Sequence, residues 1–166
     1  MANRLTEVIQ RRRQDGILMD TNLLLLFCIG SWRRELVRSH KRLAAYTEED
    51  FDLLAQIVAA FSIRYTTPHI LAEVCNLAPF GAKATRSEVF SALHFNLINL
   101  KEEFVQYAEL SQRPEFRWAG LTDTAILAIS GLNPLLLTDD LRLADYAARS
   151  GIDAFNFNHI RSLNWN

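Results

Sequence analysis

At 166 residues, with 49% hydrophobic and 22% charged side chains, the chain can bury one core, and its composition is globular rather than disordered or fibrous. The net charge of −1 excludes tight nucleic-acid binding through bulk charge, so any phosphate contact needs a local basic patch or bound cations. The longest apolar stretch, residues 23–29, cannot cross a bilayer and no signal peptide is recognisable, so we expect a soluble, cytoplasmic protein with no membrane association.

The N-terminal segment is predicted to be helical. Leu5, Val8 and Ile9 stand at helical spacing, and we expect residues 1–15 to form an N-terminal helical extension of a single domain. Three arginines at 11–13 end this helix, where positive charge suits the helix dipole. Phosphate binding is the alternative role for these arginines.

Residues 16–23, Gly-Ile-Leu-Met-Asp-Thr-Asn-Leu, form an apolar run that stops on an acid and two small polar residues. Such a run predicts a buried strand, with Asp20 at its carboxyl end, where open α/β sheets bind ligands. The competing interpretation is that Asp20 only caps the following helix. That helix is predicted over 23–29 and is expected to end at Gly30.

Residues 32–42 contain the densest basic patch of the chain. A helical face exposed to solvent is one interpretation, and a groove for a polyanion, with Trp32 stacking on a base, is the other. The sequence does not decide between them. The candidate RNA-binding residues of this patch are Arg33, Arg34, Arg38, Lys41 and Arg42.

An apolar helix carries the next candidate residue. Thr47 is expected to cap a helix, residues 62–66 to form a short strand, and Thr67-Pro68 to begin another helix. Within that last helix, Glu73 stands among apolar neighbours. We expect little of this helix to be exposed to solvent, and a buried carboxylate is costly unless it is paired or binds a metal. We therefore favour a functional role for Glu73 over a place on the solvent side.

Two helices are predicted next, over residues 83–99 and 100–110, the second with Phe104, Tyr107 and Ala108 in the core. A helix of small and aliphatic residues follows over 120–129. In it, Asp123 is either a first-turn acid, a common use of aspartate, or a second carboxylate directed into a cleft.

The segment 133–140 repeats the pattern of residues 16–23: an apolar strand ends on Thr138, Asp139 and Asp140. A helix is predicted over 141–149 and an edge strand over 153–157, and the tail to residue 166 gives no signal. Strands that alternate with helices predict an α/β fold, a central mostly parallel sheet flanked by helices, formed by one domain over residues 1–166.

Acids thus follow two buried strands and occur in two apolar helices. If Asp20, Glu73, Asp123 and either Asp140 or Asp139 met at one sheet edge, they would repel one another unless cations neutralised them. Mg²⁺ or Mn²⁺ suits carboxylate oxygens, whereas zinc is disfavoured because we find no histidine or cysteine at a ligand spacing. Metal-assisted phosphodiester hydrolysis is the chemistry that uses such a cluster.

The segments 17–22, 70–77, 120–126 and 135–140 resemble, in order and separation, the four acidic motifs of PIN-domain nucleases, and the chain is similar to toxin ribonucleases of the VapC type. The resemblance implies a Rossmann-like PIN domain with endoribonuclease activity that depends on Mg²⁺ or Mn²⁺. It implies metal ligation and catalysis by four acids, with Asn22 and Thr138 as polar supports. These four acids are Asp20, Glu73, Asp123 and Asp140.

The resemblance also implies binding partners, and it bears on the choice between Asp139 and Asp140. An RNA substrate, a homodimer and an antitoxin protein are expected from it. The family pattern favours Asp140 in the fourth motif, with Asp139 as a further metal ligand. The segment 32–60 is longer than in typical toxins of this kind. The alternative function is a catalytically inactive PIN-like module that binds protein or RNA.

Overall fold

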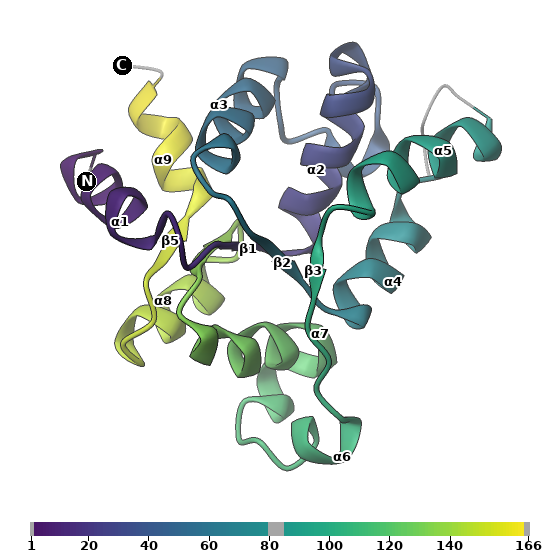
Figure 1. Cartoon of the computed structure of the whole chain (residues 1–166). Coiled ribbons are helices and arrows are strands. Elements are labelled where there is room, and N and C mark those ends of the chain that lie inside the picture. The colour runs from purple at the N-terminus through teal and green to yellow at the C-terminus, as the bar shows by residue number, and fades with distance from the viewer. Residues whose placement is uncertain (1, 80–84, 165–166) are drawn as a thin grey trace.

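The computed structural model describes residues 2–79 and 85–164. A five-stranded sheet lies at its centre in the order β3-β2-β1-β4-β5, and every pair of neighbouring strands is parallel (Figure 1). This confirms the predicted α/β class with a parallel central sheet. The strands are β1 (Ile17–Met19), β2 (Arg64–Thr66), β3 (Lys101–Glu102), β4 (Leu135–Thr138) and β5 (Ala154–Asn156).

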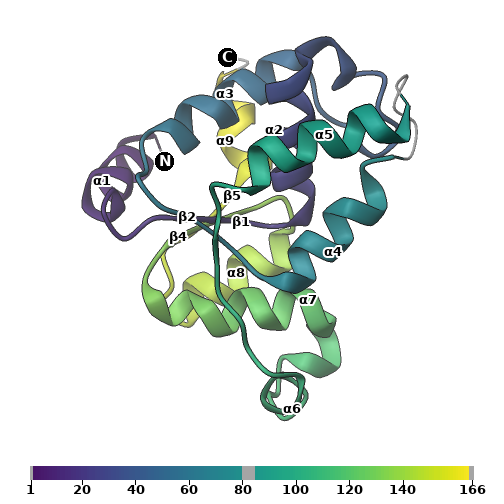
Figure 2. The same ribbon diagram turned by 45° about the vertical axis from the view of Figure 1, so that its right-hand side comes forward.

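Helices cover both faces of the sheet. In the two views, α2, α3, α5 and α9 lie on one side of the strands, and α6, α7 and α8 lie on the other (Figures 1 and 2). In the described part of the chain, no helix is long and apolar enough to cross a membrane. The helices are α1 (Ala2–Arg12), α2 (Thr21–Trp32), α3 (Glu48–Ala59), α4 (Pro68–Leu77), α5 (Arg86–Leu97), α6 (Tyr107–Leu110), α7 (Phe116–Ile129), α8 (Leu141–Arg149) and α9 (Phe157–Asn164).

The two central strands are the most buried. All residues of β1 and β4 are buried, as expected for strands that have a helical layer on each face. Their register sets Ile17 opposite Leu135 and Met19 opposite Leu137, so β4 ends one residue beyond β1, at Thr138. The residues that follow them, Asp20 and Asp139, therefore emerge side by side at the carboxyl edge of the sheet.

The order of the strands creates a switch point at this edge. From β1 the chain proceeds outward to β2 and then β3, and it later returns to place β4 on the other side of β1. The connections after β1 and after β4 consequently lead away in opposite directions, and ligands of open α/β sheets bind outside the carboxyl ends of strands at such a point.

Helix caps agree with the sequence where capping residues were expected. The side chain of Thr47 accepts a hydrogen bond from the amide of Asp50, the carboxylate of Asp50 accepts one from the amide of Thr47, and Thr67 caps α4. The predicted end of α2 at Gly30 is wrong, because α2 continues to Trp32. A Cβ at Gly30 would lie 2.2 Å from Cδ2 of Phe51, so this glycine allows α3 to pack closely and does not end the helix.

The predicted helix over 100–110 is wrong for its first part, and only residues 107–110 are helical, as α6. Residues 101–102 form the edge strand β3, and the amide of Glu103 extends the pairing by donating to the carbonyl of Thr66. Phe104 and Tyr107, expected in the core, are 70% and 61% exposed. Pairing with β2 decides this segment, and a short apolar pattern does not distinguish a strand from a helix. Lys83, the first residue of the preceding predicted helix, lies outside the described residues.

The structure defines two segments whose conformation the sequence did not predict, the basic segment 32–42 and the C-terminal tail. The basic segment after α2 is not a helical face but contains the short 3₁₀ turns Arg34–Leu36 and Lys41–Leu43. The C-terminal tail forms α9, which buries Phe157 and Ile160 against the core. The N-terminal helix is present as α1, over Ala2–Arg12.

Candidate functional site

Asp20 follows β1 at the switch point of the sheet. Its side chain is buried, and its Oδ1 accepts a hydrogen bond from the amide of Leu23 at 2.9 Å, so it does cap α2. Its Oδ2 accepts hydrogen bonds from Thr138 Oγ1 at 2.5 Å and from the amide of Asp139 at 2.7 Å. Burial and the nearby charge of Asp139 outweigh these donors and raise the pKa of Asp20 to about 8.

Glu73 of α4 is held by two hydroxyl groups. Its Oε2 accepts from Thr21 Oγ1 at 2.8 Å, and its Oε1 accepts from Thr122 Oγ1 at 2.5 Å. These bonds link α4 to the beginnings of α2 and α7. The expectation that little of this helix is exposed to solvent is wrong, because Ala72, Glu73 and Asn76 are exposed. Position and hydroxyl partners, rather than burial cost, distinguish Glu73.

Asp123 of α7 lines the same cavity as Glu73. This helix is interrupted at Gly120, whose φ of 74° is non-helical, and Asp123 lies in the first turn after the interruption. Its half-buried carboxylate accepts no hydrogen bond from the described residues. Burial, followed by the charges of Asp140, Glu73 and Asp139, raises its pKa to about 6. A carboxylate without donors among three other acids is suited to bind a cation.

The paired aspartates after β4 have different surroundings. Asp140 is exposed and caps α8: its Oδ1 accepts from the amides of Arg142 and Leu143 at 2.7 and 3.0 Å. Asp139 is half-buried, and both of its oxygens accept from Asn22 Nδ2, at 3.1 and 3.2 Å. Asp140 therefore keeps one oxygen free, whereas Asp139 is fixed by neutral donors.

Tyr46 completes the surroundings of Asp139 and was not singled out from the sequence. Its buried hydroxyl donates to Asp139 Oδ2 at 2.5 Å. Burial and this bond to a carboxylate raise the pKa of Tyr46. Tyr46 lies between two elements at a position with no motif, so no sequence signal marks it. By contrast, Thr21 and Thr122 stand next to predicted acids and could have been included as supports.

The polar supports lie at the site. Thr138 is buried, donates to Asp20 and accepts a hydrogen bond from the amide of Asp140 at 3.0 Å. Asn22, half-buried at the start of α2, contacts Asp139 as described and accepts from Arg42 Nε at 3.2 Å. The structure thus places Asn22 and Thr138 beside the two acids that flank the switch point.

Most of the basic patch is paired with acids of α3 and α5. Arg34 forms ion pairs with Asp52 at 2.6 Å, with Glu49 at 3.7 Å and with Glu48. Arg38 pairs with Glu49 at 3.8 Å, and Arg33 pairs with Glu88, also at 3.8 Å. Of the predicted RNA-binding residues, Arg42 alone contacts a residue of the acidic site within the described structure, and Lys41 is exposed.

We refer to Asp20, Glu73, Asp123, Asp139 and Asp140 as the acidic cluster. Within residues 2–79 and 85–164, none of them forms an ion pair with arginine, lysine or histidine. Their oxygens are the donors that Mg²⁺ or Mn²⁺ prefers. As these side chains stand, no three acidic, histidine or cysteine groups of the described residues converge on one ion. Asp123 and the free oxygen of Asp140 are the donors that could turn toward one without losing a hydrogen bond.

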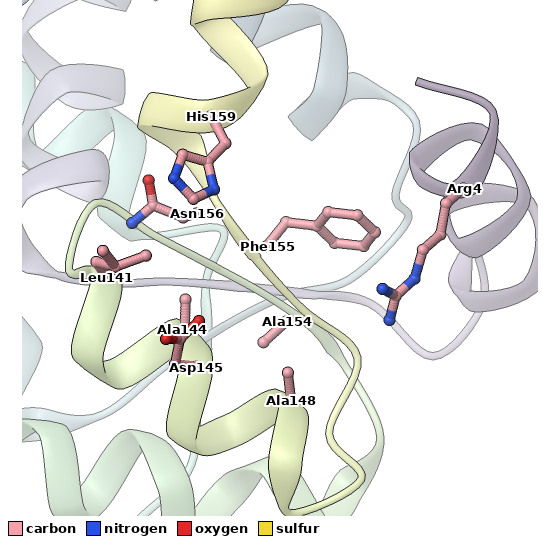
Figure 3. Close-up of a pocket in the computed structure, with 9 residues that line it drawn as sticks. All are labelled: Arg4, Leu141, Ala144, Asp145, Ala148, Ala154, Phe155, Asn156 and His159. Atoms are coloured by element: carbon pink, nitrogen blue, oxygen red, sulfur yellow. The ribbon is translucent and has the colours of Figure 1, made fainter. Parts of the chain in front are cut away.

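One cavity is lined by residues of the acidic cluster, and a second is lined by Leu141, which follows Asp140. A cleft of about 430 Å³ between α4 and α7 is lined by Glu73, Asp123 and the half-buried His69. The second cavity, of about 380 Å³, lies between α8, the edge strand β5 and α9, with Arg4 of α1 across its opening (Figure 3). Leu141, the residue after Asp140, lines this second cavity. His69 was not predicted as a site residue, although it stands four residues before Glu73 and hence on the same helical face.

Comparisons with known proteins do not place the chain in a family. No protein-family model matches the sequence, and neither the curated proteins nor the solved structures contain a significant match. The function is therefore inferred from the geometry and chemistry of the site.

Proposed function

We propose that this chain is a PIN-type ribonuclease that hydrolyses RNA phosphodiester bonds with the help of Mg²⁺ or Mn²⁺. The observation that carries the proposal is the acidic cluster, gathered without a cationic partner at the switch point of a parallel sheet. Carboxylates that raise one another's pKa are costly to keep together, and a bound cation offsets this cost. A homodimer and an antitoxin partner stay predictions of the sequence resemblance alone.

The residues have separable roles in this proposal. Asp123, Asp140, Glu73 and Asp20 would hold the ion, which would activate water and stabilise the leaving oxygen. Asp139 is fixed by Asn22 and Tyr46, so we assign it to orienting the site and Asp140 to ligation. Thr138 orients Asp20, and Thr21 and Thr122 orient Glu73.

The test is cleavage of single-stranded RNA with Mn²⁺ or Mg²⁺ and with EDTA. We expect cleavage only with metal, and a loss of more than about a hundredfold in Asp20→Asn and in Asp123→Asn, because a metal centre supplies several kcal/mol of transition-state stabilisation. Asp145→Asn is the matched control: this exposed aspartate on α8 lies outside the acidic cluster and should leave activity unchanged.

Circular dichroism and thermal melting must show that the variants remain folded. Cleavage that survives in a folded Asp123→Asn variant would contradict the assignment. Metal-independent binding of RNA with no cleavage would favour the PIN-like binding module instead.

A further inference from the structure

The cleft between α4 and α7 continues from the acidic cluster and suggests where RNA lies. Its lining includes Glu73 and Asp123 together with His69, Ala72 and Gly120. A Cβ built on Gly120 would meet no atom within 4 Å, so the cleft is open there. Its volume of about 430 Å³ falls in the range of pockets that hold small organic groups.

His69 presents one edge of its ring to this cleft. Its Nδ1 is buried without a hydrogen-bond partner, whereas Nε2 is not buried. In the described structure, the ring makes no hydrogen bond or ion pair. A buried N–H without an acceptor is rarer and more costly than an unpaired acceptor, so we assign the hydrogen to Nε2. An accessible N–H donor therefore lies on the side of the cleft.

The other lining groups cannot take this role. Glu73 and Asp123 repel phosphate, and the Thr122 hydroxyl already donates to Glu73. Ala72 and Gly120 have no polar side chain. His69 is thus the lining side chain that is free to donate a hydrogen bond to an anionic group beside the acidic cluster.

We propose that His69 is a substrate-binding residue, whose Nε2 donates a hydrogen bond to a phosphate of single-stranded RNA in the cleft between α4 and α7. This phosphate belongs to the nucleotide next to the bond that the acidic cluster would cleave, so the inference rests on the proposed function. The cavity beside β5 lies on the other flank, and its histidine, His159, provides a direct comparison (Figure 3).

The test is fluorescence anisotropy with a labelled single-stranded RNA of about ten nucleotides, in EDTA so that no cleavage occurs. We expect His69→Ala to weaken binding about tenfold, the loss of one hydrogen bond to a charged group. His69→Gln keeps an N–H near the Nε2 position and should restore most of the affinity. His69→Phe keeps a ring without a donor and should bind as weakly as His69→Ala.

Two histidines serve as matched controls. His159→Ala probes the cavity beside β5, and His94→Ala removes an exposed histidine of α5. Both should bind RNA like the parent chain, and thermal melting should show all variants folded. In a cleavage assay with Mn²⁺, His69→Ala should raise KM and leave kcat nearly unchanged.

The outcomes separate this inference from the proposed function. Unchanged binding by His69→Ala, no recovery with His69→Gln, weaker binding by His159→Ala alone, or no RNA binding by the parent chain would each overturn the role of His69. RNA binding that depends on His69 without any metal-dependent cleavage would support the role and overturn the hydrolysis. Metal-dependent cleavage that is unchanged in His69→Ala would support the hydrolysis and overturn the role of His69.

Discussion

Acidic residues lie at both ends of the sheet, but their partners differ. At the amino end, Asp153 precedes β5 and accepts hydrogen bonds from Arg12 at 2.7 Å and from Arg11 at 2.8 Å, and Arg12 also pairs with Asp15 at 2.9 Å. At the carboxyl end, the acidic cluster has hydroxyl, amide and backbone donors but no ion pair within the described residues. Within the described residues, the acid before β5 is therefore paired with arginine, whereas the acidic cluster has no ion-pair partner.

The pKa values follow this difference. Burial acts to raise the pKa of Asp153, but the bonds from Arg12 and Arg11 outweigh it and lower the pKa below the usual value. At the carboxyl end, burial and neighbouring carboxylates raise the pKa of Asp20 to about 8 and that of Asp123 to about 6. Acids at the amino end serve stability, whereas acids at the carboxyl end reduce it unless a cation binds.

The largest expected effect is the pH dependence due to Asp20. Its pKa is raised from 3.8 to about 8 on folding, so the unfolded chain loses this proton first and the folded state holds it between these values. The free energy of unfolding in EDTA should therefore fall as pH rises through this window, by on the order of several kcal/mol. Urea unfolding measures it, and Asp20→Asn should flatten the profile. An equally steep profile in that variant would contradict the assignment.

The second largest effect should be the stabilisation of the folded chain by a bound metal ion. Mn²⁺ at a hundred times its Kd should add about 2.7 kcal/mol to the free energy of unfolding, because it binds only the folded site. For a chain of this length, that corresponds to a rise in Tm of roughly 5–10 °C. Differential scanning fluorimetry with and without EDTA measures the rise, which Asp123→Asn should largely abolish. The absence of any shift in the parent chain would argue against a metal centre.

Removal of one carboxylate charge should change the free energy of unfolding in opposite directions at the two ends of the sheet. In EDTA near neutral pH, Asp123→Asn should stabilise the fold by about 1 kcal/mol, since it relieves repulsion from Asp140 and Glu73. Asp153→Asn should destabilise it by about 1–2 kcal/mol, because Arg12 loses its partly buried partner. Urea unfolding of the two variants tests the comparison, which fails if both changes have the same sign.

Tyr46→Phe should have the smallest effect. It removes the hydroxyl that donates to Asp139 and should cost about 0.5–1 kcal/mol of stability. A double-mutant cycle with Asp139→Asn isolates this contact, since residues in contact show a coupling energy. Fully additive changes would mean that Tyr46 does not orient Asp139.

The sequence by itself determined the central strands and the acids that follow them. Residues 17–19 and 135–137 are apolar throughout, which fits burial on both faces, and the runs stop at Asp20 and at Thr138, which precedes Asp139. Local capping signals at Thr47 and Thr67 also located the starts of two helices, because capping depends on neighbours within three residues. Parallel pairing then brings the predicted acids to one edge of the sheet.

Only the tertiary structure decided which partners these residues meet. The strand β3 exists because its backbone pairs with β2, and Glu73 is oriented by hydroxyls from α2 and α7. Tyr46 reaches Asp139 across 93 positions of sequence, and the arginine patch is largely neutralised by acids of α3. Such contacts depend on packing between distant segments, so no local pattern predicts them. The same packing opens the cleft beside His69.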